Sequence, residues 1–237
     1  VNGAQFIERV KRETGIHLDI ISPKEEARLA VMGCHALLEQ GEGPALIFDI
    51  GGGSTELVLV STTGGVPEIL DWVSVPWGVV SLTESERAEA ETPEQLNAIY
   101  TSMRAKVMAS FAEFAARLPE DGGDRRLLGT SGTVTTLASV YLKLNSYDRR
   151  AVDGLHLPTA AMREISRELA GRDIDGRAEF PTIGHERADL VVAGCAILEA
   201  IFDIWPGERL GVADRGIREG ILRALMASDA KRRNRRN

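Results

Sequence analysis

The chain has 237 residues and a net charge of -7 at neutral pH, with 43% hydrophobic and 27% charged residues. This size and balance are typical of one large or two small globular domains with a buried core. The negative charge disfavours nucleic-acid binding, and we expect neither a bilayer-spanning segment nor a signal peptide. Because the sequence opens on Val1 rather than Met, we expect it to be part of a longer protein.

The cysteines and histidines show no metal-binding pattern. Cys34 and Cys195 lie far apart in apolar, helix-like surroundings, which is typical of buried reduced thiols in a cytoplasmic protein rather than of a disulfide or a zinc site. The four histidines stand singly, without the spacing of metal ligands: His17, His35, His156 and His185.

The chain begins with two predicted helices, separated by a strand-like run over residues 17–21. Apolar residues at helical spacing predict the first helix over residues 3–14. The second helix is expected to begin after Ser22, whose hydroxyl suits an N-cap, and to run to about Leu38. Its first turn carries two acidic residues, Glu25 and Glu26.

A glycine-rich motif, Phe48 to Glu56, lies between two apolar runs and predicts a strand, a tight turn and a returning strand. Its three glycines have no Cβ atom, so their amide groups can close around a phosphate, and the next two residues add hydroxyl donors. The predicted phosphate-binding residues here are Gly51, Gly52, Gly53, Ser54 and Thr55.

Two carboxylates flank these glycines. Asp49 and Glu56 are placed to hold a divalent cation or to position a water molecule. The motif is not a Walker A loop, because no Gly-Lys-Ser/Thr follows and a strand rather than a helix comes next. An ordinary tight hairpin with solvated acids is the alternative, but such hairpins seldom need three glycines.

The rest of the chain predicts a mixed α/β sheet that starts with a meander, because three strands precede alternating helices and strands. Turns are expected at residues 62–65 and 121–123, and a loop at 171–184. The predicted strands are 66–75, 126–129 and 209–212, and the predicted helices are 92–118, 134–144, 185–205 and 217–226, with one more starting at 157–159.

A second glycine turn, Gly129 to Thr133, connects a predicted strand to a predicted helix. Such a turn directs backbone N–H groups and the helix dipole toward one point, which suits an anion, although it is also an ordinary strand-to-helix connection. Ser131 and Gly132 are therefore added to the predicted phosphate-binding residues.

Together these motifs favour phosphate chemistry by positioning and metal charge rather than by covalent catalysis. Neither Ser54 nor Ser131 lies in the Gly-x-Ser-x-Gly motif typical of a serine nucleophile, and no histidine lies near either in sequence. A glutamate at a helix start could orient or deprotonate water, which makes Glu25 and Glu26 candidates. Helix-dipole stabilisation explains both acids equally well.

The motif from Phe48 to Glu56, with Ser22 to Leu29 upstream, resembles the exopolyphosphatase/guanosine pentaphosphate phosphohydrolase family. Further motifs follow in the family's order: Trp77 to Glu84, Gly129 to Thr133, Glu186 to Asp189, and Gly216 to Gly220. The resemblance covers essentially the whole chain.

The resemblance implies an actin-like, ribonuclease H-like fold with the active site in a cleft between two α/β domains. It implies release of phosphate from polyphosphate or from the 5′ end of guanosine pentaphosphate with Mg²⁺, and a homodimer. Glu26 matches the family's catalytic base. Asp49 and Glu56 match the family's acids that bind the metal and position the attacking water. The resemblance therefore implies a metal-binding role for both residues and a catalytic role for Glu56 as well.

One departure concerns the family's other phosphate loop, Asp-x-Gly-Ser-Asn-Ser, which this sequence lacks. We therefore expect residues 1–24 to be a remnant of the first domain, 25–228 the second domain, and 229–237 a basic disordered tail. The last helix is expected to pack back on the first domain. With half of its phosphate site missing, this chain alone could be folded and still inactive.

Two other functions share these motifs. An actin-like kinase would transfer phosphate from ATP to a small acceptor, using the same glycine loop. A non-catalytic sensor would bind guanosine pentaphosphate without cleaving it. The run Glu25 to Arg28 favours the hydrolase.

Overall fold

The computed structural model describes residues 2–62, 67–86, 92–120 and 124–234. The turn predicted at 121–123 and residues 63–65 of the turn predicted at 62–65 lie outside the described residues. The described strands form one six-stranded mixed sheet in the order β3-β2-β1-β4-β6-β5. They are β1 (Ala45–Ile50), β2 (Thr55–Ser61), β3 (Glu68–Val75), β4 (Arg126–Gly129), β5 (His156–Pro158) and β6 (Arg209–Val212).

Helices cover both faces of this sheet. They are α1 (Gly3–Thr14), α2 (Pro23–Cys34), α3 (Val79–Ser85), α4 (Pro93–Ala115), α5 (Gly132–Tyr141), α6 (Arg149–Val152), α7 (Thr159–Ala170), α8 (Ile174–Ala178), α9 (Val191–Ile204) and α10 (Ile217–Asn234), with a 3-10 turn at His35–Leu37. None of the described helices is long and apolar enough to cross a membrane.

The sheet begins with the predicted meander. Strand β2 pairs antiparallel with both β1 and β3, while β1, β4 and β6 run parallel. Parallel strands need crossover connections, and the long segments holding α3, α4 and α5 to α9 supply them. The turns after β1 and β4 therefore lie at the same edge of the sheet.

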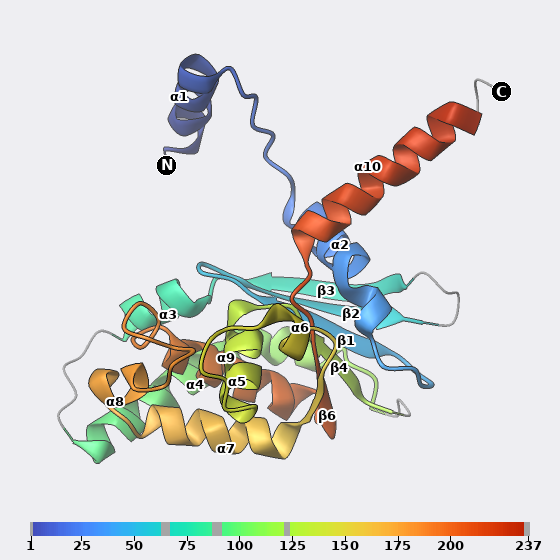
Figure 1. Ribbon diagram of the computed structural model, residues 1–237. Helices are drawn as coiled ribbons and strands as arrows, with labels where there is room; N and C mark the ends of the chain where they lie inside the picture. Colours follow the sequence, from blue (N-terminus) through green and yellow to red (C-terminus); the bar gives the residue numbers. More distant parts are fainter. Residues whose placement is uncertain (1, 63–66, 87–91, 121–123, 235–237) are drawn as a thin grey trace.

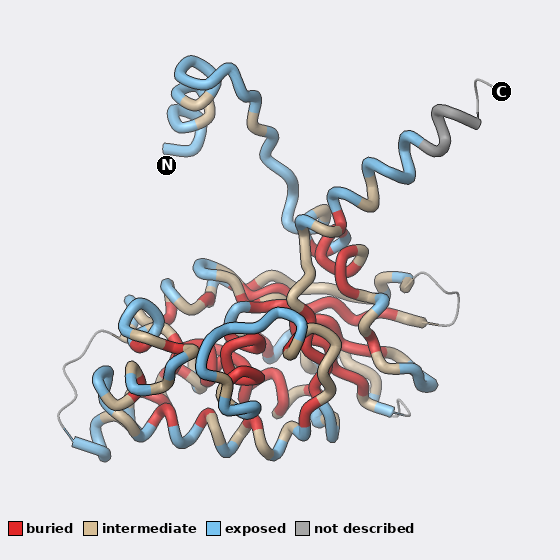
Figure 2. The backbone as a smooth tube through the Cα atoms, in the orientation of Figure 1, coloured by how far each residue is buried: buried red, intermediate tan, exposed pale blue. Residues whose placement is uncertain are grey.

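Alternation of side chains along β1 divides the core into two layers. Leu46, Phe48 and Ile50 join the larger apolar cluster, which includes buried residues of α4, α7 and α9. Ala45 and Ile47 face the smaller cluster under α2. The buried tube in Figure 2 follows the sheet and α9, which carries twelve buried residues and forms the centre of the larger layer.

The two terminal helices extend away from the sheet on the side of α2 (Figure 1). No residue of α1 is buried, and Phe6 is 59% exposed. Helix α10 starts against α2 and then leaves the body, with Leu222 and Met226 exposed. The expected division of the chain into domains stays a prediction.

Several predicted boundaries are wrong. Residues 17–21 form no strand, because no neighbouring strand pairs with them. The predicted loop 171–184 contains α8, which Asp173 caps by accepting from the Gly176 amide. Helix α9 starts at Val191 rather than at residue 185. Helix α10 continues through Asn234, so residues 229–234 of the predicted disordered tail are helical. Residues 235–237 lie outside the described residues.

Helix α10 crosses α2 with their backbones in direct contact. A Cβ added at Gly33 would lie 1.9 Å from the Gly216 carbonyl oxygen, and one added at Gly220 would lie 1.9 Å from the Leu29 carbonyl oxygen. Only glycine permits this approach. Because α2 also carries Glu26, this contact fixes the helix that presents the predicted catalytic base.

We expect Gly220→Ala to lower the free energy of unfolding by about 3 kcal/mol, since the clash is with backbone and no side chain can move to relieve it. Gly171→Ala is the control. Gly171 caps the end of α7 with a φ of -81°, and a Cβ added there would have no atom closer than 3.5 Å. The variant should therefore change the free energy of unfolding by less than about 0.5 kcal/mol. Urea unfolding measures both. Equal stability of the two variants would contradict this packing.

Candidate active site

Two carboxylates face each other across the first hairpin. Asp49 of β1 pairs in register with Glu56 of β2, and both point to the face that α2 covers. Burial and the charge of Glu56 raise the pKa of Asp49 to about 7, while the Thr130 hydroxyl opposes this rise and Glu26 adds to it. The structure thus brings the two predicted metal-binding acids together.

Glu56 is held by hydroxyl groups. Ser54 donates to its Oε1 at 2.7 Å, and Ser74 of β3 donates to the same oxygen at 2.8 Å. The side chain is buried, with 6% exposed. Two donors on one oxygen fix the carboxylate's orientation and leave Oε2 without a described hydrogen-bond partner, so Oε2 is free to accept from water or to bind a cation.

Glu26 and its neighbour Glu25 have different roles in the structure. Glu25 binds Arg28 through two hydrogen bonds of 2.7 and 2.8 Å, which lower its pKa. Glu26 makes no ion pair with a described residue; partial burial and the nearby charge of Glu56 raise its pKa. Of the two candidates, Glu26 is the one without an ion pair to a described residue, and it lies near enough to Asp49 and Glu56 for their charges to interact.

The first residues of α3 donate hydrogen bonds to the carbonyl groups of the glycine loop. Val79 N–H donates to the Gly51 carbonyl at 2.9 Å, and Val80 N–H donates to the Gly52 carbonyl at 2.8 Å. In a trans peptide the next N–H points opposite to the carbonyl. The N–H groups of Gly52 and Gly53 therefore point away from α3, and neither donates to a described backbone carbonyl. These amides are available to an anion.

The second turn presents a helix N-terminus at the same edge. Ser131 caps α5: its hydroxyl oxygen accepts from the Val134 amide at 3.2 Å. The amides of Gly132 and Thr133 lie in the first turn, where no helix carbonyl can reach them. An anion placed there would also be favoured by the helix dipole.

Both turns line one cavity of about 190 Å³. Gly51 and Gly52 come from the first turn, and Gly132 and Thr133 from the second. Arg187 supplies a cation at its wall and donates to the Thr136 hydroxyl at 3.3 Å. The structure thus unites two turns that lie about eighty residues apart in sequence.

Two of the predicted hydroxyl donors, Ser54 and Thr55, donate within the protein, whereas the Ser131 hydroxyl accepts a hydrogen bond. Thr55 donates to the Trp77 carbonyl at 2.7 Å and is fully buried, Ser54 binds Glu56, and Ser131 caps α5. Their assignment as phosphate ligands stays a prediction. Arg187 is the residue that sequence reasoning missed. It lies in the motif Glu186 to Asp189, so the motif's place in the family's order was the available signal.

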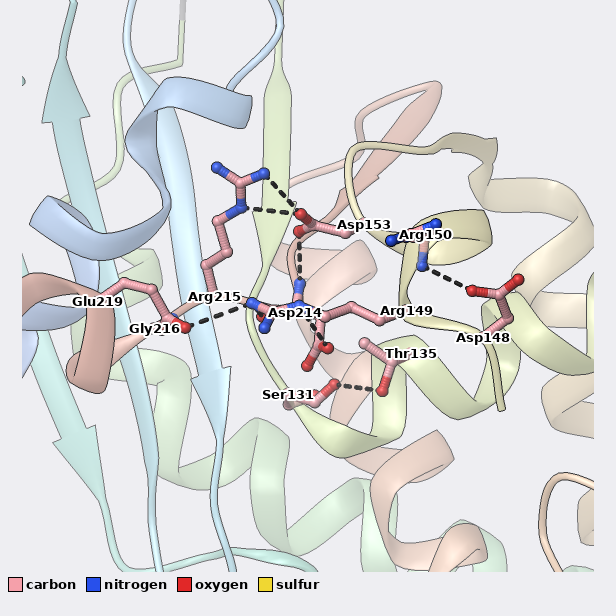
Figure 3. A network of polar contacts seen from close by, with 10 residues as sticks. All are labelled: Ser131, Thr135, Asp148, Arg149, Arg150, Asp153, Asp214, Arg215, Gly216 and Glu219. Atoms are coloured by element: carbon pink, nitrogen blue, oxygen red, sulfur yellow. Dashed lines mark hydrogen bonds and ion pairs between the residues drawn. The ribbon is translucent and has the colours of Figure 1, made fainter. Parts of the chain in front are cut away.

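A network of ion pairs fixes the turn that leads into α10 (Figure 3). Asp153 accepts from the Arg215 guanidinium at 2.8 Å and from the Asp214 amide at 3.0 Å. Arg149 binds Asp214 and Glu219, and Glu219 accepts from the Gly216 amide at 2.9 Å. This network holds Gly216 against both α2 and the second glycine turn.

The carboxylates fit a cation that is also bound by substrate. Among the described residues, no three His, Cys, Asp or Glu side chains lie close enough to hold a metal ion together. Mg²⁺ commonly takes one or two protein carboxylates and completes its shell with water and phosphate oxygens. Asp49 and Glu56 meet that requirement, whereas a site made of protein ligands alone is not present in the described part of the chain.

Comparison with known proteins identifies the family. Residues 1–229 match the Ppx/GppA phosphatase family. The chain belongs to this family. Membership suggests that a divalent cation takes part in the family's chemistry. It also supports the resemblance drawn from the motifs at Phe48 to Glu56 and after.

Among curated relatives, Exopolyphosphatase 2 of Mycobacterium tuberculosis is 30% identical over 187 residues, covering 79% of this chain and 56% of that protein. Guanosine-5′-triphosphate,3′-diphosphate pyrophosphatase of Aeromonas salmonicida is 29% identical over 232 residues, covering 96% of this chain and 43% of that protein. The chain therefore spans about half the length of the curated relatives it matches.

Solved structures agree with this assignment. The Aquifex aeolicus member of the Ppx/GppA family matches with a TM-score of 0.75 and 27% identity, over 96% of this chain and 70% of that one. An exopolyphosphatase from Cytophaga hutchinsonii matches with a TM-score of 0.78 and 21% identity, over 96% of this chain and 71% of that one. The predicted actin-like, mixed-sheet α/β fold is confirmed.

The raised pKa of Asp49 predicts an unusual dependence of stability on pH. The folded state holds this proton up to about pH 7, whereas the unfolded chain releases it near pH 4, so wild type loses stability between these values. Relative to wild type, Asp49→Asn should gain about 4 kcal/mol of unfolding free energy on going from pH 4 to pH 8, because the pKa rises by about three units. Urea unfolding without divalent cations measures this.

Asp71→Asn is the control of opposite sign. A hydrogen bond from Arg117 lowers the pKa of Asp71, so its carboxylate stabilises the fold at neutral pH. This variant should lose stability at pH 8 relative to wild type. If Asp49→Asn and wild type had the same pH dependence of stability, burial and the nearby acids would not raise the pKa of Asp49.

Proposed function

We propose that the protein containing this chain is a metal-dependent hydrolase of terminal phosphoanhydride bonds, which releases orthophosphate. The observation that carries the proposal is the convergence of Glu26, Asp49 and Glu56 beside a glycine loop with available amides. Membership of a phosphatase family supports it. Three acids with no described basic partner repel one another, which favours a bound cation or a shared proton.

The proposed mechanism assigns a separate task to each group. Glu26, with its raised pKa and no ion-pair partner, orients the attacking water and accepts its proton. The free amides of Gly52 and Gly53, with those of Gly132 and Thr133, bind the oxygens of the transferred phosphoryl group. Mg²⁺ bound by Asp49 and Glu56 would neutralise charge on the phosphate oxygens.

The proposed substrates are inorganic polyphosphate and the 5′-terminal phosphate of guanosine pentaphosphate, after the names of the relatives from Mycobacterium tuberculosis and Aeromonas salmonicida. The buried free thiols of Cys34 and Cys195 favour the reducing cytoplasm as the place of action. A homodimer is proposed from the family resemblance. The assay is phosphate release from both substrates, side by side, with and without Mg²⁺, by the full-length protein.

Glu26→Gln in the full-length protein should lower kcat for phosphate release at least about 100-fold, because the amide cannot accept the proton of water. Glu25→Gln is the matched control: among the described residues the Glu25 carboxylate binds Arg28 alone, and kcat should change less than about threefold. Circular dichroism checks that both variants fold. Unchanged turnover of Glu26→Gln would refute the role of this base.

Arg187→Gln should raise KM about tenfold with a smaller effect on kcat, because the guanidinium at the cavity wall attracts the anionic substrate before and during the reaction. Arg12→Gln, on exposed α1, removes the same charge far from the cavity and should leave both constants unchanged. Equal KM values for the two variants would exclude Arg187 from substrate binding.

A further inference from the structure

A second polar pocket lies away from the glycine turns, among α4, α7 and α9. Its volume is about 310 Å³, within the range of small-molecule sites. It shares no lining residue with the cavity at the two turns. Its polar lining comes from three helices: Asn97, Tyr100, Thr101 and Arg104 from α4, Arg167 from α7, and Glu199 from α9.

The inner wall of this pocket carries two buried polar side chains, each with an atom that makes no hydrogen bond to a described residue. Glu199 is 4% exposed and Tyr100 is 7% exposed. Neither the Oε1 atom of Glu199 nor the Oη atom of Tyr100 makes a hydrogen bond to a described residue. Buried carboxylates are normally hydrogen-bonded, because burial without a donor is costly. Burial, with the nearby charges of Cys195 and Glu199, raises the pKa of Tyr100, so Tyr100 and Glu199 lie beside each other. The Glu199 Oε1 and Tyr100 Oη atoms can therefore accept N–H donors from one ligand group.

Two arginines stand near Glu199 but beyond hydrogen-bonding distance. Arg104 Nη1 lies 3.9 Å from Oε2, and Arg167 Nε lies 4.0 Å from Oε1. Arg104 is already bound to Asp203. Arg167 donates no hydrogen bond to a described residue, and its side chain is 66% exposed. A cation thus stands at the mouth of the pocket, a few ångströms from an anion at its base.

We propose that this pocket binds a small zwitterion, an amino acid in the chemical sense. Its ammonium group donates to Glu199 and Tyr100 at the base, and its carboxylate accepts from Arg167 at the mouth. A lone anion would meet the charge of Glu199, and a lone cation would meet that of Arg167. A molecule with both charges close together satisfies both residues.

A metal ion does not fit this pocket, because Glu199 is the only carboxylate in its lining and no described cluster of three metal-ligating side chains exists. The pocket is also linked to the other cavity through one rigid element. Val191, at the start of α9, lines the cavity at the glycine turns, and Glu199 lies about two turns further along the same buried helix.

The test is calorimetric titration of the purified chain with β-alanine, γ-aminobutyrate and L-serine, beside propylammonium and propionate, which carry one charge each. At least one zwitterion should bind saturably below about 10 mM and raise the melting temperature. Glu199→Gln and Arg167→Gln should each weaken that binding at least about tenfold. Neither readout involves phosphate release, so the result is independent of the proposed hydrolysis.

Arg172→Gln is the matched control, because Arg172 follows α7, pairs with Glu168 and lies outside the pocket lining. Its binding should equal that of wild type. Arg167 is exposed and its variant cannot disturb the core, so the test stands even if Glu199→Gln fails to fold. Three results would each overturn the proposal: no zwitterion binds, a single-charge probe binds as tightly, or Arg167→Gln leaves the affinity unchanged.

Discussion

The site depends on a contact between two backbones. Gly216 and Gly220 bring the start of α10 against α2 so closely that no side chain fits between them. The ion pairs of Arg149, Asp153 and Glu219 hold the turn before α10 in place (Figure 3). Helix α2 is thereby fixed over the sheet, and Glu26 in its first turn is held near enough to Asp49 and Glu56 for their charges to interact. A change at this crossing moves the carboxylate relative to the loop without touching either.

The sheet itself places the other two acids. Because side chains alternate along a strand, Asp49 shares a face with Ala45 and Ile47, and its register partner Glu56 shares that face. Both acids therefore point under α2, while Ile50 points into the other core layer. The turn between them cannot slip by one residue without moving both carboxylates to the opposite face, so the hairpin register and the site are one constraint.

The sequence predicted those features that depend on a few neighbouring residues, such as helix caps and tight turns. The Ser22 cap, the glycine turn after β1 and the turn after β4 all form as their residue types demand. The motif order predicted that Glu26 and Asp49 belong to one site. What could not be predicted depends on contacts distant in sequence. Residues 17–21 are strand-like, yet no described strand pairs with them. Arg187 lines the cavity from the segment before α9, which begins later than its apolar pattern indicates.

The hydrogen bonds of the structure show that the predicted hydroxyl ligands also have structural roles. Sequence motifs direct attention to hydroxyl groups, but Ser54 orients Glu56, Thr55 binds the Trp77 carbonyl and Ser131 caps α5. Each hydroxyl thus stabilises a neighbouring element, and its further role as a phosphate ligand stays a prediction. Backbone amides are fixed by the fold and need no side-chain ordering when an anion arrives, so they are the better donors for charge that develops during phosphoryl transfer. The hydroxyls contribute by keeping those amides and the carboxylates in position.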